Sequence, residues 1–331
     1  MIVGQGEYRY EVAEDWGRLP AGWDYGDVNG VATDSQDRVY IFTRSEHPVV
    51  VFDREGRLLG SWGEGIFRRP HGVTITPDDV LWCTDDTDHT VRKFTVDGKL
   101  LQTLGVKDQP SDSGYVGATG PGCLLTIRRG AGPFNRPTKV AVAPNGDLYI
   151  TDGYGNARVH RFSASGEYIQ SWGEPGEGPG QFMLPHSLFI HRSGRVFVCD
   201  RENNRVQIFS LTGEYLSVWT DLLRPAELWI DKDDRVYLGE LYWDKGVVDM
   251  VGRVMPETRP GRVSVRDLDG KILSNWGGPD PFAPGSFSSA HGLCVDSHGD
   301  IYVGEVALTA LGRTGRYGPR AHSIQKFIRL R

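Results

Sequence analysis

The sequence lacks the features of membrane-spanning, nucleic-acid-binding and disulfide-built proteins. No apolar run approaches the about 20 residues that a membrane-spanning helix needs. Acidic residues outnumber basic ones by 43 to 37, and the formal net charge of −6 disfavours binding to a phosphate backbone. The opening residues contain no basic segment followed by an apolar core. We therefore expect a cytoplasmic protein with neither a membrane nor a nucleic-acid partner.

Cysteine is scarce, with four residues in 331, and the spacing matches neither a zinc-binding pair nor a disulfide framework. Two of the four fall inside strand-like runs. We therefore expect reduced thiols at Cys83, Cys123, Cys199 and Cys294.

What the sequence does contain is an internal repeat of about 30 to 40 residues, the length of a propeller blade. Each repeat holds short runs of alternating β-branched and aromatic residues, joined by turns such as "PNGD" and "SHGD", which are hairpin signals. The repeats begin at Val31, Val73, Val140, Leu188, Leu228 and Leu293.

Six units of about four strands each can close into a ring that leaves few exposed sheet edges. The pattern thus predicts an all-β, six-bladed β-propeller, with residues 1–331 forming a single domain. The sixth unit lacks a clear fourth strand, and the N-terminal segment "EYRYEVAEDW" has no partner of its own. We expect this N-terminal strand to complete the sixth blade and close the ring.

Two insertions interrupt the repeat, at residues 107–134 and 242–260. Loops of this length inside a compact domain are usually functional lids or disordered segments. The sequence leaves both readings open.

Histidine occurs at one position of the repeat in alternate units. Alignment on the first strand of each unit makes equivalent Asn29, His71, Thr138, His186, Ala226 and His291. The first strands of a propeller line its central channel, so three alternate units would aim three imidazoles at one axial point. Three histidines from separate strands, with room for water or substrate, form a catalytic zinc site. A single histidine could equally cap an inner turn, but the alternation favours the metal site.

The other histidines lack this register and are expected at the surface or at blade edges: His47, His89, His160, His191, His298 and His322.

A second set of candidates follows the second strand of three units. Arg44 ends "YIFTR", Arg201 ends "VFVCDR", and Tyr154 lies in "TDGYGN". Two guanidinium groups beside a metal suit a carboxylate ligand, because each can donate two parallel hydrogen bonds. A tyrosine beside a dication is suited to act as a general base. The alternative is that the arginines form salt bridges with loop acids such as Asp85 or Glu202.

These residues resemble those of the NHL-repeat propellers and, among them, the peptidyl-α-hydroxyglycine α-amidating lyases. The similarity is most specific from "FNRPTKVAV" at Phe134 to "RVQIF" at Phe209, and it can be traced from Val31 to the C-terminus. The resemblance implies zinc bound by three histidines, a catalytic tyrosine in a "DGY" triplet and two active-site arginines. In this sequence these are His71, His186, His291, Tyr154, Arg44 and Arg201.

The chemistry that the resemblance implies is the cleavage of a carbinolamide into an amide and an aldehyde such as glyoxylate. Zinc would bind the hydroxyl group, Tyr154 would accept its proton, and the two arginines would hold the carboxylate. No redox cofactor is needed. The implied substrate is a small hydroxy-amide or ureido carboxylate.

The sequence departs from the family at three places. Gly292 stands where the family has an acidic residue that holds a structural calcium, which argues against Ca²⁺ in this chain. Gly155 follows Tyr154 directly, so the cysteines that brace the secreted members are missing. The segment "SSAH" replaces a more apolar approach to the third histidine.

Two other functions stay open at this point. Propeller shape alone would also suit a metal-dependent hydrolase of the lactonase type, although such enzymes bind their metal mainly through carboxylates and Asn. A non-catalytic NHL scaffold would instead bind a partner protein through the two insertions.

Overall fold

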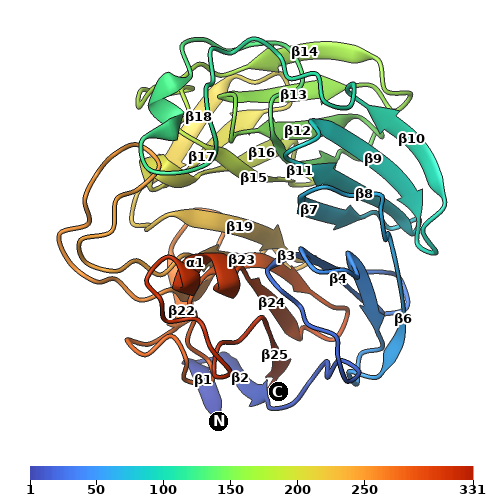
Figure 1. Ribbon diagram of the computed structural model, residues 1–331, viewed down its shortest axis with the longest axis vertical. Helices are drawn as coiled ribbons and strands as arrows, with labels where there is room; N and C mark the ends of the chain where they lie inside the picture. The colour runs from blue at the N-terminus through green and yellow to red at the C-terminus, as the bar shows by residue number, and fades with distance from the viewer. Residues whose placement is uncertain (331) are drawn as a thin grey trace.

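The computed structural model describes residues 1–330, which form six antiparallel sheets around a common centre (Figure 1). The sheets are called blades 1 to 6, in the chain order of their innermost strands. Blade 1 consists of β3 (Val28–Thr33), β4 (Val39–Thr43), β5 (Val49–Phe52) and β6 (Leu58–Trp62). Blade 2 consists of β7 (Pro70–Ile75), β8 (Val80–Asp85), β9 (Thr90–Thr95) and β10 (Leu100–Leu104).

Blade 3 consists of β11 (Pro137–Val142), β12 (Leu148–Asp152), β13 (Arg158–Phe162) and β14 (Tyr168–Trp172). Blade 4 consists of β15 (Pro185–Ile190), β16 (Arg195–Asp200), β17 (Arg205–Ser210) and β18 (Tyr215–Trp219). Blade 5 consists of β19 (Pro225–Ile230), β20 (Val236–Glu240), β21 (Arg262–Arg266) and β22 (Ile272–Trp276). The predicted six-bladed propeller is confirmed.

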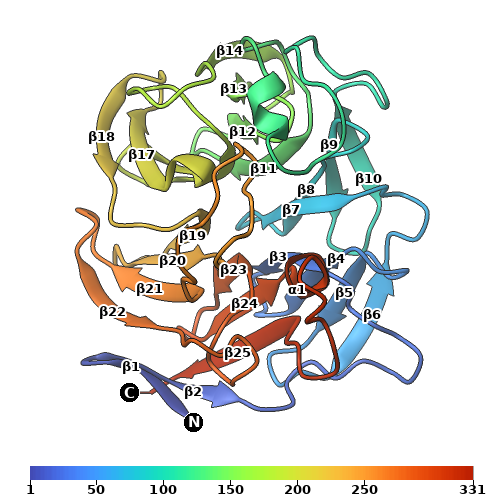
Figure 2. The ribbon, with the colours of Figure 1, turned by 60° about the vertical axis from the view of Figure 1, so that its left-hand side comes forward.

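Blade 6 joins the two ends of the chain. Its strands β23 (Ala290–Val295), β24 (Ile301–Glu305) and β25 (Ile324–Arg329) come from the C-terminal part of the chain. Strand β2 (Tyr8–Ala13) pairs antiparallel with β25 (Figure 2), with Val12 opposite Phe327. The prediction that an N-terminal strand closes the ring is confirmed. Strand β1 (Ile2–Gln5) adds a fifth strand at the outer edge of this blade.

The core lies between neighbouring blades. The second strands are almost wholly apolar and buried, as in "VYIFT" of β4, because each blade is covered on both faces by its neighbours. A repeated contact links the outer strands: Gly98 of blade 2 lies against Trp62 of blade 1, and Gly213 of blade 4 against Trp172 of blade 3. A Cβ atom on either glycine would approach the indole to 2.7 Å. The tryptophans of the repeat therefore serve packing between blades.

Each innermost strand carries a register shift at the same place. The shift falls between Pro185 and Ser187 in β15, between Ala290 and Gly292 in β23, and at the matching positions of the other four blades. A β-bulge inserts one extra residue and re-aims a side chain. The residue at the shift is the repeat position that holds histidine in blades 2, 4 and 6.

Three long connections lie outside the blades. Residues 107–134 join β10 to β11 and contain the short 3-10 helix η1 (Cys123–Thr126). Residues 242–260 join β20 to β21 as an excursion with two isolated bridges, Trp243 to Arg259 and Val248 to Val254. The third connection joins β24 to β25 and contains α1 (Ala307–Gly312). Within residues 1–330, no helix has the length and apolar character to cross a membrane.

Candidate metal centre and catalytic site

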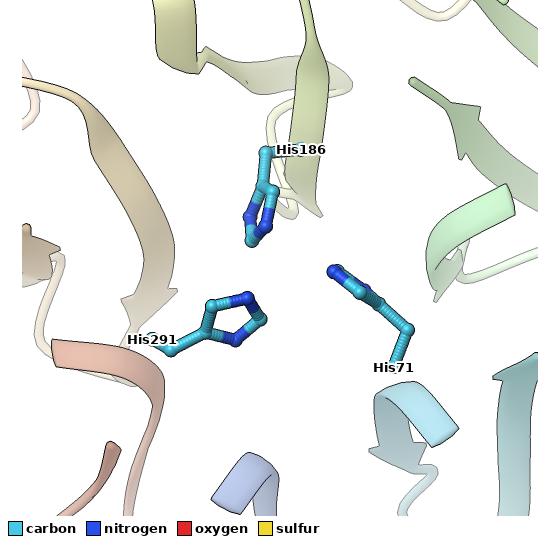
Figure 3. A group of neighbouring side chains, drawn as sticks. All are labelled: His71, His186 and His291. Carbon is cyan, nitrogen blue, oxygen red and sulfur yellow. The ribbon is translucent and has the colours of Figure 1, made fainter. Parts of the chain in front are cut away.

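Three histidines meet at the centre of the ring. His71, His186 and His291 come from β7, β15 and β23, and their side chains point toward one another (Figure 3). One ring nitrogen from each lies within 4.8 Å of the others, and the ring centroids are 4.6 to 4.9 Å apart. All three are buried, with exposures of 1 to 3%. The sequence register thus placed these three side chains together.

The second nitrogen of each ring fixes its orientation. Each Nδ1 donates to the carbonyl of the equivalent residue in the next blade, from His71 to Thr138 (2.7 Å), from His186 to Ala226 (2.7 Å) and from His291 to Asn29 (2.8 Å). An Nδ1 that carries its proton leaves Nε2 with a free lone pair, as a metal ligand requires. Burial lowers the pKa of all three rings well below the usual value, which favours the neutral form. The three rings therefore fit a metal ion that prefers nitrogen ligands, such as zinc.

Tyr154 lies directly beside this cluster. It follows β12, and its hydroxyl oxygen is 3.3 Å from Nε2 of both His71 and His186. Arg201 donates from Nη1 to the same oxygen at 3.1 Å. The guanidinium carbons of Arg201 and Arg69 lie 5.4 and 5.7 Å from the Tyr154 ring centroid. Two guanidinium groups therefore lie close to the phenol.

Arg201 belongs to a buried charge cluster with one acid and a second arginine. Glu202 Oε1 accepts from Arg201 Nε (2.9 Å) and from Arg224 Nη2 (2.8 Å). Burial alone would raise the pKa of Glu202, but Arg224 and Arg201 hold it at about 2. The salt bridge expected as an alternative does form, yet it uses only one edge of Arg201, because Nη1 faces Tyr154.

Arg44 lies in the wall of the same pocket as Tyr154, Arg201 and His291. Its Nη1 forms a salt bridge with Asp27 (3.2 Å), a loop acid as the alternative expected, and its Nε donates to the carbonyl of Pro70 (3.3 Å). Its Nη2 is buried and has no hydrogen-bond partner among the described residues. One donor of Arg44 is therefore free for a ligand. Asp85, the other acid considered as a partner, instead accepts from the backbone N–H groups at residues 68 and 69.

Sequence reasoning missed two further arginines in the pocket wall, Arg69 and Arg224. Each stands two residues before the channel position of its blade, which is His71 in blade 2 and Ala226 in blade 5. Extending the repeat alignment by two residues would have found them. The expectation that the remaining histidines lie at the surface or at blade edges is wrong for His160. That residue is fully buried on β13, with Nε2 3.1 Å from Asp152.

The insertions cover the pocket. Their backbones are hydrogen bonded, from Gly122 N–H to the carbonyl of Asp249 (3.2 Å) and from Leu124 N–H to that of Met250 (3.1 Å). Met250 packs with Tyr154 in one apolar cluster. The pocket lining includes Thr119 from the first insertion, residues 242–244, 247 and 250 from the second, and residues 309–311, 313 and 314 around α1. The insertions are thus parts of the candidate site.

The residues one position further along the innermost strands do not fit calcium, the second metal that the resemblance raises. Lys139 donates from Nζ to the carbonyl of Val73 (2.9 Å) and to Glu227 Oε2 (2.8 Å), and it is 8% exposed. Ser187 donates to the other oxygen of Glu227. An ammonium group therefore already satisfies the acceptors that a cation would use. Gly292 adds no carboxylate, so this layer argues against a calcium site.

Comparisons with known proteins agree with the fold. A family model described as a 6-bladed beta-propeller matches residues 133–227. A streptogramin B lyase structure covers 96% of this chain and 97% of its own, with a TM-score of 0.59 at 15% identity. A gluconolactonase structure from Xanthomonas campestris covers 98% of this chain and 90% of its own, with a TM-score of 0.61 at 12% identity. At these identities the likeness shows the fold alone.

The curated relatives are more similar in sequence. Peptidyl-alpha-hydroxyglycine alpha-amidating lyase 1 of Drosophila melanogaster is 31% identical over 266 residues, 76% of this chain and 45% of that protein. Peptidyl-glycine alpha-amidating monooxygenase B of Xenopus laevis is 29% identical over 339 residues, 91% of this chain and 35% of that protein. NHL repeat-containing protein 3 of Homo sapiens is 32% identical over 223 residues, 62% of this chain and 60% of that protein.

The chain therefore spans less than two thirds of the length of each of these relatives. It is a six-bladed β-propeller whose homologues are named as amidating lyases and as NHL repeat-containing proteins.

Proposed function

We propose that the chain is a zinc-dependent lyase. It cleaves the C–N bond of a small α-hydroxy-N-acyl carboxylate and releases an amide and an aldehyde such as glyoxylate. The observation that carries this proposal is the group of three neutral imidazoles whose Nε2 atoms face one point, with the Tyr154 hydroxyl 3.3 Å from two of them. The relatives named as amidating lyases support the same class of reaction.

His71, His186 and His291 would hold the zinc ion through Nε2. Their Nδ1 protons are already committed to backbone carbonyls, so the rings need no change of tautomer to bind a metal. Zinc held in this way supplies Lewis-acid chemistry, the polarisation of a hydroxyl oxygen. The enclosed position keeps bulk water away from the reacting carbon.

Tyr154 is the proton carrier of the proposed reaction. As a phenolate it takes the proton of the substrate hydroxyl at Oη, and the C–O bond becomes a carbonyl while the C–N bond breaks. The same proton returns from Oη to the departing nitrogen, which leaves as a neutral amide. Arg201 donates to Oη at 3.1 Å and orients the phenol, and Arg69 lies near the ring. Atoms and electrons balance without a redox cofactor.

Arg44 and Arg201 orient the substrate through its carboxylate. Arg44 Nη2 is a buried donor without a partner, and burial makes a charged acceptor favourable there. Arg201 is 4% exposed and is held in place by Glu202. Binding the carboxylate at these groups fixes the hydroxyl-bearing carbon between the histidines and Tyr154.

The test is glyoxylate release from N-acetyl-α-hydroxyglycine by zinc-loaded protein. We expect turnover in the wild type and at least a 100-fold loss in Tyr154→Phe, because the proton carrier is missing while the ring remains. Tyr168→Phe is the matched control, since that tyrosine lies half exposed on an outer strand. Activity on lactones or esters but not on carbinolamides would contradict the proposal. Zinc-loaded protein that turns over neither class of substrate would contradict it as well.

A further inference from the structure

The cover of the pocket has two parts that are joined by an ion pair. One is the insertion at residues 242–260, which is joined by backbone hydrogen bonds to the insertion at residues 107–134. The other is the connection that contains α1. Asp244 of the first part accepts from Arg316 of the second, from Nη1 to Oδ1 (3.0 Å) and Oδ2 (2.8 Å). Arg316 also lies 5.5 Å from the ring centroid of Tyr242.

The cover contacts the site directly. Met250 Sδ lies 2.9 Å from Arg201 Nη2, and the Arg224 guanidinium lies 3.9 Å from the ring centroid of Trp243. Leu241, Trp243 and Met250 are each only 4 or 5% exposed. Bulky side chains of the cover therefore line part of the pocket, and two of them pack on its arginines.

This enclosure has a consequence for substrate size. A peptide extending from the scissile nitrogen advances about 3.3 to 3.6 Å per residue and needs partners for its own N–H and C=O groups. The lining of the pocket includes the apolar side chains of Leu241, Trp243 and Met250, which take up space and offer no such partners. We propose that the covered pocket selects compact substrates, with a short acyl group on the nitrogen and no peptide chain. This inference rests on the proposed function and narrows its substrate class.

The experiment compares a length series of N-acyl-α-hydroxyglycines, from acetyl and benzoyl to acetyl-dipeptidyl and acetyl-tetrapeptidyl, by glyoxylate release. We expect kcat/KM to fall at least 100-fold from the acetyl to the tetrapeptidyl member. In Arg316→Ala, which breaks the ion pair between the two parts of the cover, the ratio of kcat/KM for the acetyl member to that for the tetrapeptidyl member should fall at least 10-fold. Arg259→Ala is the matched control, because its ion pair with Glu257 in the same insertion is exposed and the ratio should not change. A flat series in the wild type would overturn the inference.

Measurements of ligand binding distinguish this inference from the lyase proposal. N-acetylglycine and an acetyl-tetrapeptidyl-glycine lack the hydroxyl group and cannot react, and calorimetry on zinc-loaded protein measures their affinities. Preference for the small ligand by at least 10-fold supports size selection even if no member of the series is cleaved, and in that case only the proposed reaction fails. Equal affinities, or tighter binding of the peptide, would overturn size selection whether or not cleavage occurs.

Discussion

Two neighbouring layers of the channel contrast sharply in how they use polar residues. In the layer of His71, His186 and His291, each Nδ1 is satisfied by a carbonyl of the next blade, while the Nε2 atoms face one another. In the layer one residue further along the strands, Lys139 and Glu227 neutralise each other directly. The first layer leaves lone pairs for a ligand, and the second leaves none.

The two layers differ because the blades place different residues at the two neighbouring positions. In the second layer, blades 1, 2 and 6 place glycines, and a Cβ atom at Gly72 would lie 2.2 Å from the carbonyl oxygen of Thr138. Side chains therefore enter that layer from blades 3, 4 and 5, as Lys139, Ser187 and Glu227. Adjacent positions on the same bulged strands thus pair charges in one layer and present ligand nitrogens in the other.

The largest effect is expected from breaking the first layer. Changing any one of its histidines to alanine should lower glyoxylate release by at least about 1000-fold, since a metal contributes several kcal/mol of transition-state stabilisation and about 1.4 kcal/mol is tenfold. Steady-state kinetics on zinc-loaded protein measure it. His298→Ala is the control, because that side chain is 49% exposed and belongs to neither layer. Wild-type turnover in any of these histidine variants would contradict a catalytic metal centre at the three imidazoles.

Disrupting the second layer should lower the stability of the protein and leave zinc binding unchanged. Lys139→Met leaves the Glu227 carboxylate buried without its cation, and removing one partner of a buried pair costs about 3 to 5 kcal/mol. Urea denaturation should show that loss in the free energy of unfolding, with zinc content unchanged. The double variant Lys139→Met/Glu227→Gln should recover part of it, because no charge is then left unpaired. Equal losses in the single and double variants would mean that the ion pair is not what stabilises the layer.

A smaller effect is expected for Arg44, which lies in the pocket wall with His291. Arg44→Met removes a hydrogen bond to a charged group, worth about 1.5 to 3 kcal/mol, and should raise KM about 10- to 100-fold. Arg57→Met on the surface is the control, with 76% of its side chain exposed. A fall in kcat at unchanged KM would instead place Arg44 in the chemical step.

The smallest effect concerns the thiols packed around the channel. Burial raises the pKa of Cys83, Cys199 and Cys294, so they should resist a thiol reagent at pH 8 in the native protein. All four thiols should react after denaturation, since none is in a disulfide. The Lys139→Met variant should label slightly faster if it loosens the second layer. Rapid native labelling in the wild type would show that the blades open readily.

Most of the correct predictions from the sequence came from its internal repeat. The alternation of apolar residues and the Asp/Gly turns define the blades, and the blade register aligns His71, His186 and His291. The closure by the N-terminal strand followed from an unpaired segment at one end and a missing strand at the other. These inferences succeed because they depend on periodicity, which a sequence displays directly.

The rest depends on contacts between segments that no period relates. The pairing of Lys139 with Glu227 joins residues from blades 3 and 5, and the contact of Met250 with Arg201 joins an insertion to a blade. Sequence reasoning also gave no signal for α1, which lies in a connection between two strands of blade 6. The bulge that aims each histidine is likewise a matter of strand pairing rather than residue type.

The central claim is that three imidazoles hold one zinc ion on the axis. Anomalous diffraction from crystals of the purified protein, recorded on both sides of the zinc absorption edge, tests it directly. The account predicts one peak per chain, about 2.0 to 2.1 Å from Nε2 of His71, His186 and His291. No peak at that point, or a peak in the layer of Lys139 and Glu227 instead, would contradict it.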